Sequence, residues 1–333
     1  MKVVFFHRKP NDGNFSIESL FNFIRTYLPL DVCWEIKEMR FHSRGFFKRL
    51  YIGFEAFCSQ GDVNHITGDI NFLALFLKKR KTVLTIHDVG FMNNSNPFYR
   101  LLLLWFWIRL PVKRCALITT VSHATRLELL KYVKIDPDRI QVIYVPISKR
   151  FVPFPKKIFN KEEPCILQIG TKHNKNVIRL VQALEGIPCK LEIVGELDKE
   201  LESALEAAKV KYTQSKNLTD EEILDKYKSA DIVSFVSTYE GFGMPIVEAN
   251  AIGRVVITSR ILSMPEVAGN AAHLVDPYDV QSIRDGIIKV ITDAQYRNAL
   301  IANGYLNRQR FSAETIALQY AAIYHHLHSK GSS

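Results

Sequence analysis

The chain has 333 residues, of which 47% are hydrophobic and 23% charged. This length suits two domains that each bury a core, and the balance excludes disordered and fibrous proteins. The net charge of +10 is concentrated before residue 160, where 25 Lys and Arg stand against 12 Asp and Glu. We therefore expect an anionic partner for the first half. No RNA-binding, zinc-finger or helix-turn-helix pattern is present, so we expect an anionic membrane surface and no nucleic acid.

Short β-branched runs alternate with longer helical patterns, which indicates βαβ units and parallel sheets. The first set of predicted strands is Val3–Phe6, Val63–Ile66, Thr82–Ile86, Leu117–Val121 and Val142–Val145. The second set is Cys165–Ile169, Lys190–Val194, Ile232–Val236, Val255–Ile257 and His273–Val275. Helices are predicted at Ser16–Tyr27, Asn176–Glu185, Lys199–Ala208, Asp220–Ser229 and Asp279–Asp293. Two successive sets predict two doubly wound, Rossmann-like α/β domains.

The stretch 146–164 holds four prolines and a run of basic residues, which is typical of a linker. We expect an N-terminal domain at 1–155, a C-terminal domain at 156–311, and a helix at 312–333 that packs back on the first domain. The first apolar run predicts a strand, because it is too short for a signal peptide. The five cysteines are odd in number and lack metal-binding spacing. The absence of a signal-peptide pattern and this cysteine usage together predict a cytoplasmic protein.

Two segments of the basic half, 40–51 and 98–114, interleave basic and aromatic residues. The apolar run 101–108 is far shorter than the roughly 20 residues that span a bilayer. Such a run fits either a buried helix or a segment that rests on a membrane surface. If the second alternative holds, the protein is peripheral at the inner face of the plasma membrane.

The segment 237–253, STYEGFGMPIVEANAIG, carries the strongest chemical signal. It follows a buried strand, breaks into a Gly-Phe-Gly loop, and enters a predicted helix at Pro245, a residue suited to the first helical position. This junction presents backbone N–H groups and a positive helix end at the carboxyl edge of a sheet, where anions bind. Glu240 and Glu248 flank those donors, and their carboxylates can accept hydrogen bonds from sugar hydroxyls.

The sequence here resembles retaining glycosyltransferases of family 4, which have the GT-B fold of two Rossmann-like domains facing across a cleft. EGFGMPIVE is their Glu-x7-Glu motif. The similarity extends over roughly residues 116–290, through LQIGTKHNKN at 167–176, KNLTDEEILDKYKSAD at 216–231 and the PEV-G-AA-VDP pattern after Ser259. The resemblance implies an enzyme that moves a sugar from a nucleotide-sugar donor to a glycan or lipid-linked acceptor.

The resemblance also implies roles for residues of the second half. Glu248 would bind the ribose hydroxyls, Glu240 a hydroxyl of the transferred sugar, and Lys175 the donor diphosphate. The backbone N–H groups of Gly241, Phe242, Gly243 and Met244 would also hold the sugar. Asn217 and Leu218 would border the base. Relatives often carry an arginine on the diphosphate where this chain has Thr171 or Lys172.

In the first half, His87 in TIHDVGF resembles the active-site histidine of the family, next to the sugar. Gly13 and Asn14 belong to the first strand-to-helix loop, which would lie near the diphosphate but has one glycine where many relatives have two. The pair Asp136 and Asp138 is interpreted as a turn before a strand, not a metal motif.

The resemblance and the charge of Lys175 together predict no metal and no other cofactor. A nucleotide-sugar epimerase on the same fold, or a non-catalytic protein that binds sugar nucleotides or membranes, stays open as an alternative. Retention of both Glu240 and Glu248 argues against the non-catalytic alternative.

Overall fold

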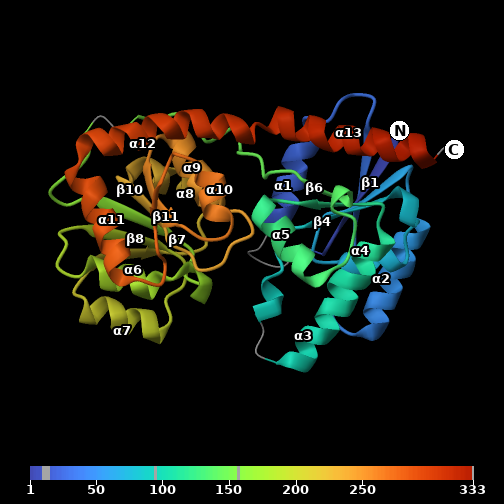
Figure 1. Ribbon diagram of the computed structural model, residues 1–333, viewed down its shortest axis with the longest axis horizontal. Helices are drawn as coiled ribbons and strands as arrows, with labels where there is room; N and C mark the ends of the chain where they lie inside the picture. Colours follow the sequence, from blue (N-terminus) through green and yellow to red (C-terminus); the bar gives the residue numbers. More distant parts are fainter. Residues whose placement is uncertain (10–15, 94–95, 156–157, 332–333) are drawn as a thin grey trace. The chain divides into compact units, whose positions relative to one another are not determined.

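The computed structural model describes residues 1–9, 16–93, 96–155 and 158–331, and it divides the chain into two compact units (Figure 1). Unit 1 comprises Met1–Pro146 with Ser312–Ser333, and unit 2 comprises Ile147–Phe311. The division falls after Pro146, before the boundary at 155 expected from sequence. The reason is that the intervening backbone bonds to unit 2: Ile147 N donates to Phe311 O (2.9 Å), and Phe154 N donates to Ile252 O (3.1 Å).

Unit 1 is built on a parallel sheet of six strands in the order β2-β1-β3-β4-β5-β6. Its strands are β1 (Lys2–His7), β2 (Cys33–Glu38), β3 (Val63–Ile66), β4 (Thr82–Ile86), β5 (Leu117–Thr120) and β6 (Ile140–Val142). Its helices are α1 (Ser16–Arg25), α2 (Phe46–Cys58), α3 (Pro97–Leu103), the π-helical η4 (Leu104–Arg109), α4 (Leu110–Arg114), α5 (His123–Tyr132) and α13 (Ala313–Gly331). Short 3-10 turns are η1 (Asn71–Leu75), η2 (Lys79–Lys81), η3 (Gly90–Asn93) and η5 (Pro137–Arg139).

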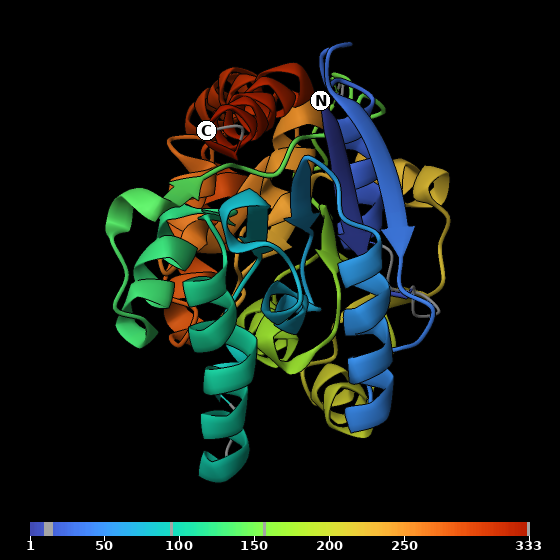
Figure 2. The same cartoon turned by 90° about the vertical axis from the view of Figure 1, so that its right-hand side faces the viewer.

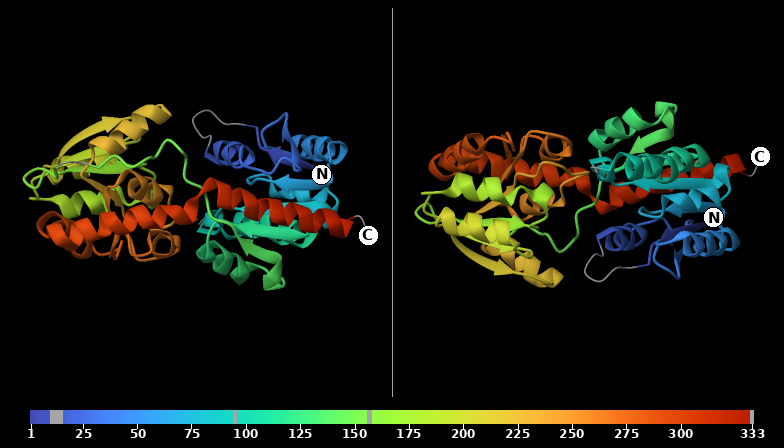
Figure 3. Two further views of the ribbon diagram at one scale, coloured as in Figure 1. Left: turned by 90° about the horizontal axis from the view of Figure 1, so that it is seen from above. Right: turned by 90° about the horizontal axis from the view of Figure 1, so that it is seen from below.

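The last helix, α13, packs on one face of this sheet together with α1 (Figure 3). A buried polar chain joins α13 to the strands: His65 Nδ1 lies 2.7 Å from the Tyr324 hydroxyl, and His65 Nε2 lies 2.7 Å from Thr85 Oγ1. Burial lowers the pKa of His65 well below its usual value, so the ring is neutral and both of its nitrogens are satisfied. The C-terminal helix is thus fixed to unit 1 by hydrogen bonds as well as by apolar packing.

Residues 97–114, one of the basic aromatic segments, form the continuous run α3–η4–α4. Leu104, Ile108 and Val112 are buried on one face, while Phe98 and Phe106 are exposed on the other. The buried-helix alternative therefore holds for one face of this segment, and contact of the other face with a membrane stays a prediction. Among the described residues, no helix is both long and apolar enough to cross a membrane.

Unit 2 repeats the architecture with the order β12-β11-β10-β7-β8-β9, again entirely parallel. Its strands are β7 (Cys165–Ile169), β8 (Lys190–Val194), β9 (Lys211–Ser215), β10 (Ile232–Phe235), β11 (Val255–Ser259) and β12 (His273–Val275). Its helices are α6 (Val177–Leu184), α7 (Lys199–Ala207), α8 (Asp220–Ser229), α9 (Met244–Ile252), α10 (Ser263–Ala268), α11 (Val280–Thr292) and α12 (Ala294–Asn307), with 3-10 turns η6 (His173–Lys175) and η7 (Arg308–Phe311). The two α/β domains predicted from the alternating pattern are confirmed.

Two strands were missed by the sequence prediction, and both lie at a sheet edge. Most side chains of β2 and β9 are exposed, so neither strand has the buried apolar run that marked the central strands. The strand predicted at Val142–Val145 forms two residues earlier, as Ile140–Val142. Among the cysteines, Cys33 and Cys58 are exposed, whereas Cys115 and Cys189 are buried.

Arg254 is a buried arginine, 1% exposed, that closes the carboxyl end of a helix in unit 2. Its guanidinium donates to Tyr227 O (3.0 Å) and Lys228 O (2.8 Å), carbonyls in the last turn of α8. It also donates to Phe154 O (2.9 Å), which attaches the linker to unit 2. The two α8 carbonyls lie in the last turn, where the helix itself supplies no N–H donor. A cation at this end of the helix is also favoured by the helix dipole.

Replacing Arg254 by Met should lower the free energy of unfolding by about 2–4 kcal/mol, because several buried carbonyls lose their donor. Urea denaturation of the whole chain measures this change. The exposed Arg260→Met serves as the matched control and should cost less than about 1 kcal/mol. Equal effects of the two substitutions would contradict the proposed role of Arg254.

Candidate active site

The carboxyl edge of the unit 2 sheet contains a topological switch point between β7 and β10. From β7 the chain proceeds outward to β8 and β9, and from β10 it proceeds to β11 and β12 on the other side. The loops that follow β7 and β10 therefore diverge from adjacent strands. In open parallel sheets, ligands bind at such a point.

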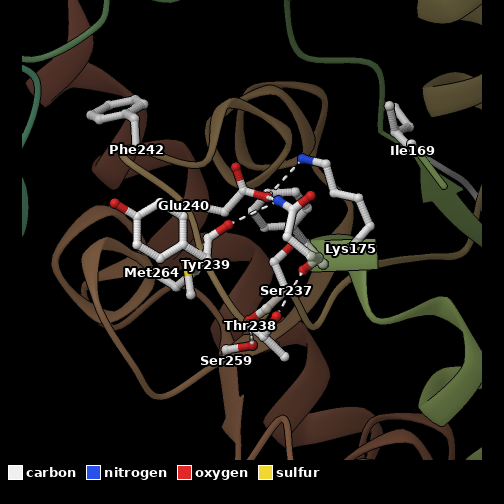
Figure 4. A network of polar contacts seen from close by, with 12 residues as sticks. Ile169, Lys175, Ser237, Thr238, Tyr239, Glu240, Phe242, Ser259 and Met264 are labelled. Atoms are coloured by element: carbon white, nitrogen blue, oxygen red, sulfur yellow. Dashed lines mark hydrogen bonds and ion pairs between the residues drawn. The ribbon is translucent and has the colours of Figure 1, made fainter. Parts of the chain in front are cut away.

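An ion pair joins these two loops (Figure 4). Lys175, at the end of η6, points its Nζ to within 2.7 Å of Glu240 Oε1, and both side chains are less than 20% exposed. Asn174 Nδ2 donates to the same Glu240 oxygen at 3.2 Å and to Tyr239 O at 2.9 Å. The Lys175 ammonium also lies 4.7 Å from the centre of the Phe235 ring. The pair is thus held from several sides.

The backbone around the pair is fixed by the loop sequence. Thr238 N donates to Asn174 O (2.8 Å), and the buried Asn176 donates from Nδ2 to Val236 O (3.0 Å). Gly170, with φ +83°, lies beside the lysine stem, and a Cβ there would stand 3.1 Å from Lys175 Cε. The glycine is therefore required both for the turn and for the path of Lys175.

The start of α10 supports the Glu-Gly-Phe-Gly turn. Its first residue, Ser263, places Oγ 3.0 Å from Glu240 O and 2.8 Å from Phe242 O, so its one hydroxyl proton is shared between the two carbonyls. The Phe242 ring is buried in an edge-on contact with Phe311, and Figure 4 shows it directed away from Glu240. Only the backbone of Phe242 is therefore in a position to face a ligand beside Glu240.

Helix α9 begins at Met244, so Pro245 is its second residue and not the first, as predicted. The N-cap is Gly243, with φ 113°, and no side chain caps the helix. A Cβ at Gly243 would approach Phe235 to 3.2 Å, so the turn depends on glycine. An N-terminus without a side-chain cap keeps its positive potential for an anion.

Glu248, on α9, is half-buried, and its Oε2 accepts a hydrogen bond of 2.5 Å from the hydroxyl of Tyr227 on α8. Burial raises the pKa of Glu248, and nearby Asp220 adds to the rise. The Tyr227 hydroxyl, Arg150 and Lys175 oppose it. One carboxylate oxygen is thus oriented by the tyrosine, while the other can accept from a ligand.

The other predicted residues of unit 2 lie on loops that follow strands. Thr171 is half-buried and Lys172 exposed, both in the loop after β7. Asn217 has φ +54° and is exposed beside the half-buried Leu218, just before α8. The structure thus places all of these residues at the ends of parallel strands or at the start of a helix.

His87 lies in unit 1, directly after β4, and is half-buried. Its Nε2 donates to Thr67 O at 2.7 Å, so in the tautomer with one proton, on Nε2, the Nδ1 atom is a hydrogen-bond acceptor. The ring passes Gly68, where a Cβ would stand 2.7 Å from His87 Cδ2. Gly13 and Asn14, the other predicted residues of this unit, lie outside the described residues.

Comparison with known families accounts for this arrangement. Residues 151–307 match the family described as Glycosyl transferases group 1, and residues 32–150 match Glycosyltransferase Family 4. The chain belongs to glycosyltransferase family 4. It is 27% identical to the O-antigen chain mannosyltransferase B of Escherichia coli over 73% of this chain and 70% of that protein. The serotype-specific mannosyltransferase WbdA of Escherichia coli is also 27% identical, over 70% of this chain but only 32% of its own length.

Solved structures show the same fold for this glycosyltransferase. Sucrose-phosphate synthase from Thermosynechococcus elongatus matches with a TM-score of 0.80 and 16% identity over 99% of each chain. HepE from Anabaena, solved with UDP and glucose, matches with a TM-score of 0.77 and 17% identity over 97% of this chain and 99% of its own. The GT-B fold expected from the resemblance is confirmed.

Three residues near the site of this glycosyltransferase were not predicted. Asn174 directly precedes the predicted lysine, so its position in KHNKN was an available signal. Tyr227 and Arg150 gave no such signal, since their proximity to Glu248 arises only when α8 and the linker pack beside α9.

Asp136 caps η5 by accepting from Asp138 N (3.0 Å), as expected of a turn. Within the described ranges, no group of three or more His, Cys, Asp or Glu side chains could hold a metal ion.

Glu248 is predicted to bind a nucleotide-sugar only when ionised. Because its pKa is raised, the carboxylate takes up a proton at a higher pH than an ordinary glutamate, and affinity should fall as the pH drops through that value. Calorimetric titration with a nucleotide-sugar between pH 4 and 8 measures how the Kd changes with pH. The diphosphate of the ligand is esterified at both ends and keeps the same charge over this range, so it does not contribute to the change.

Tyr227→Phe removes a hydrogen bond that favours the ionised form, so the loss of affinity should move to higher pH. Glu248→Gln should bind weakly, with no pH dependence from this group. A pH profile shared by wild type and Glu248→Gln would exclude Glu248 from the site.

Proposed function

We propose that this glycosyltransferase moves a hexosyl group, with retention of configuration, from a nucleotide-sugar held by unit 2 to a glycan or lipid-linked saccharide acceptor. We further propose that it acts in the synthesis of a cell-surface polysaccharide. The similar proteins include mannosyltransferases named for O-antigen chains, which supports this class of acceptor.

The observation that carries the proposal is the Lys175–Glu240 pair at the switch point, with Glu248 and the N-terminus of α9 from the same strand-to-helix junction. A diphosphate needs cationic and N–H donors, whereas ribose and hexose hydroxyls need acceptors. This edge supplies both. The Lys175–Glu240 contact keeps the two groups in place until the donor phosphate and sugar hydroxyl replace it.

In the proposed reaction, the bond between the anomeric carbon and the diphosphate oxygen breaks while the acceptor oxygen bonds to the same face of that carbon. The acceptor proton passes to an oxygen of the departing diphosphate. Lys175 and the N-terminus of α9 would stabilise the negative charge that develops on the diphosphate. We propose that these groups make a metal ion unnecessary. His87 would accept a hydrogen bond from the sugar through Nδ1.

The names of the relatives favour mannose as the transferred sugar. HepE was solved with UDP and glucose, so a glucosyl donor is the comparison to test. Thermal-shift assays with GDP-mannose, UDP-glucose and other nucleotide-sugars should identify the donor, because a ligand at 100 times its Kd stabilises the fold by about 2.7 kcal/mol.

Glu240→Gln should lower kcat at least about a hundredfold while leaving the Kd of the free nucleoside diphosphate unchanged, because Glu240 is assigned to the sugar end. Donor turnover measures kcat, and calorimetric titration with the nucleoside diphosphate measures Kd. Turnover of the wild type is also measured in EDTA, which should leave it intact. The control is Glu202→Gln, an exposed glutamate on α7. Wild-type kcat in Glu240→Gln would contradict the assignment. Isomerisation of the donor without acceptor would identify an epimerase instead.

We also propose that unit 1 rests on an anionic membrane surface. Helices α2 and α3 extend in the same direction from unit 1 (Figures 1 and 2). Phe46 and Phe47 are 74% and 83% exposed on α2, and Phe98 is 70% exposed on α3. Aromatic side chains in the open are stabilised by an interfacial environment, and adjacent basic side chains add attraction to anionic lipids.

The combined variant Phe46→Ser, Phe47→Ser and Lys48→Glu should bind phosphatidylglycerol vesicles at least about tenfold more weakly than wild type. Each basic residue near such a surface contributes about 1 kcal/mol, and the rings add apolar burial. Vesicle sedimentation at low and high salt measures the binding. Leu318→Ser with Lys79→Glu alters comparable exposed positions and serves as control. Equal binding to phosphatidylcholine and phosphatidylglycerol would contradict the electrostatic part.

A further inference from the structure

We propose that the carboxyl edge of the unit 1 sheet holds a binding pocket for a phosphate or diphosphate group on the acceptor. That this ligand belongs to an acceptor rests on the proposed function. That the pocket binds a phosphoryl group rests on unit 1 alone. The pocket is lined only by residues of unit 1 and encloses about 220 Å³. This is below the roughly 300–1,000 Å³ of sites that enclose a drug-sized ligand, so the pocket suits one compact group.

The pocket lies at the switch point of the unit 1 sheet. The chain leaves β1 toward β2 on one side and later returns to β3 on the other. Arg8 follows β1, Arg44 lies in the loop after β2, and Asp69 follows β3, and all three line the pocket. An Arg8–Asp69 ion pair joins the loops that follow the adjacent strands β1 and β3. The arrangement matches the position of the Lys175–Glu240 pair in unit 2.

The charge of the pocket is positive beyond this pair. Arg8 is matched by Asp69 and by Glu18, whose Oε1 lies 2.8 Å from Arg8 Nε. Arg44 and Arg49 also line the pocket, and among the described residues neither has an acidic partner. Two guanidinium groups without carboxylates, at the edge where ligands bind, favour an anionic ligand, and their planar forks suit phosphate oxygens.

Arg49 is held in a fixed orientation. Its guanidinium carbon lies 5.1 Å from the centre of the Trp107 ring, and it donates from Nε to Ser43 Oγ (3.3 Å) and from Nη2 to Ser43 O (3.2 Å). Its Nη1 makes no hydrogen bond within the part of the chain that the structure describes. The side chain therefore presents a donor whose ordering cost is already met by the fold.

The walls of the pocket continue into the exposed aromatic helices. Arg49 belongs to α2, and the opposite wall is Tyr99 and Leu103 of α3, with Trp107 of η4. A phosphoryl group bound here would have these apolar side chains beside its linkage. This favours a lipid-carried phosphate, in which the carrier chain lies along α3 while the head group meets the arginines.

Binding of inorganic diphosphate, measured by calorimetry on the full chain, tests the pocket separately from catalysis. We expect two classes of site in the wild type, one in each unit. Arg44→Gln with Arg49→Gln should weaken one class at least about tenfold, whereas Lys175→Gln should weaken the other. Lys79→Gln with Arg80→Gln removes the same charge from an exposed turn of unit 1 and should change neither. Arg44→Lys with Arg49→Lys should restore part of the binding, which separates charge from misfolding.

A single class of diphosphate site that Lys175→Gln abolishes, or unchanged binding in Arg44→Gln with Arg49→Gln, would overturn the proposal. Farnesyl diphosphate distinguishes the source of the ligand. Binding at least tenfold tighter than inorganic diphosphate, lost in Tyr99→Ser, would support a lipid-carried group. Equal binding would support the pocket with a soluble phosphate as its ligand. If the wild-type chain binds diphosphate at both sites but transfers no sugar, that result would count against the proposed function and not against the pocket.

Discussion

The arrangement of functional groups depends on one constraint, the reversal of strand order at the middle of each parallel sheet. Parallel strands bring all their carboxyl ends to one edge, and the reversal separates the loops that leave two adjacent strands. In unit 2 the separated loops are joined by Lys175 and Glu240, and in unit 1 by Arg8 and Asp69. Lys175 and Glu240 are largely removed from water, which can cost more than their contact returns, and the exposed Asp69 makes the second pair a weak one, so both pairs are poor candidates for stabilisers. Their place at the ligand edge suggests that they exist for binding.

The two units differ in how they could meet an anion. Residues 147–311 of unit 2 carry 22 Lys and Arg against 21 Asp and Glu, so unit 2 has no general attraction for phosphate. The proposed donor binding would therefore depend on a few placed groups, chiefly Lys175 and the helix N-terminus that follows Gly243. Unit 1 has the opposite character, with an excess of basic side chains spread over its pocket and helices.

The sequence predicted what buried periodicity and the family motifs determine. Central strands such as β4 and β10 are fully buried and were found to within a residue, whereas the exposed edge strands β2 and β9 carry no comparable pattern. The Lys175–Glu240 contact fits roles assigned from the motif. The Tyr227 hydrogen bond to Glu248 and the unit 1 pocket could not be predicted, because each depends on packing between segments far apart in the chain. The roles of the individual site residues stay predictions until variants are measured.

Protonation links the stability of unit 1 to pH in a direction opposite to that of Glu248. Burial, with the Arg25 charge, lowers the pKa of His7 from 6.5 to about 3, and His65 is lowered for the same chief reason. In the unfolded chain these rings take up protons below about pH 6.5, so folding stability falls as the pH drops from there. The raised pKa of Glu248 instead favours the folded state at low pH, since the buried carboxyl then holds a proton. Acid should therefore weaken the packing of α13 on unit 1 and donor binding by unit 2 through separate groups. A variant in one unit should leave the acid response of the other intact.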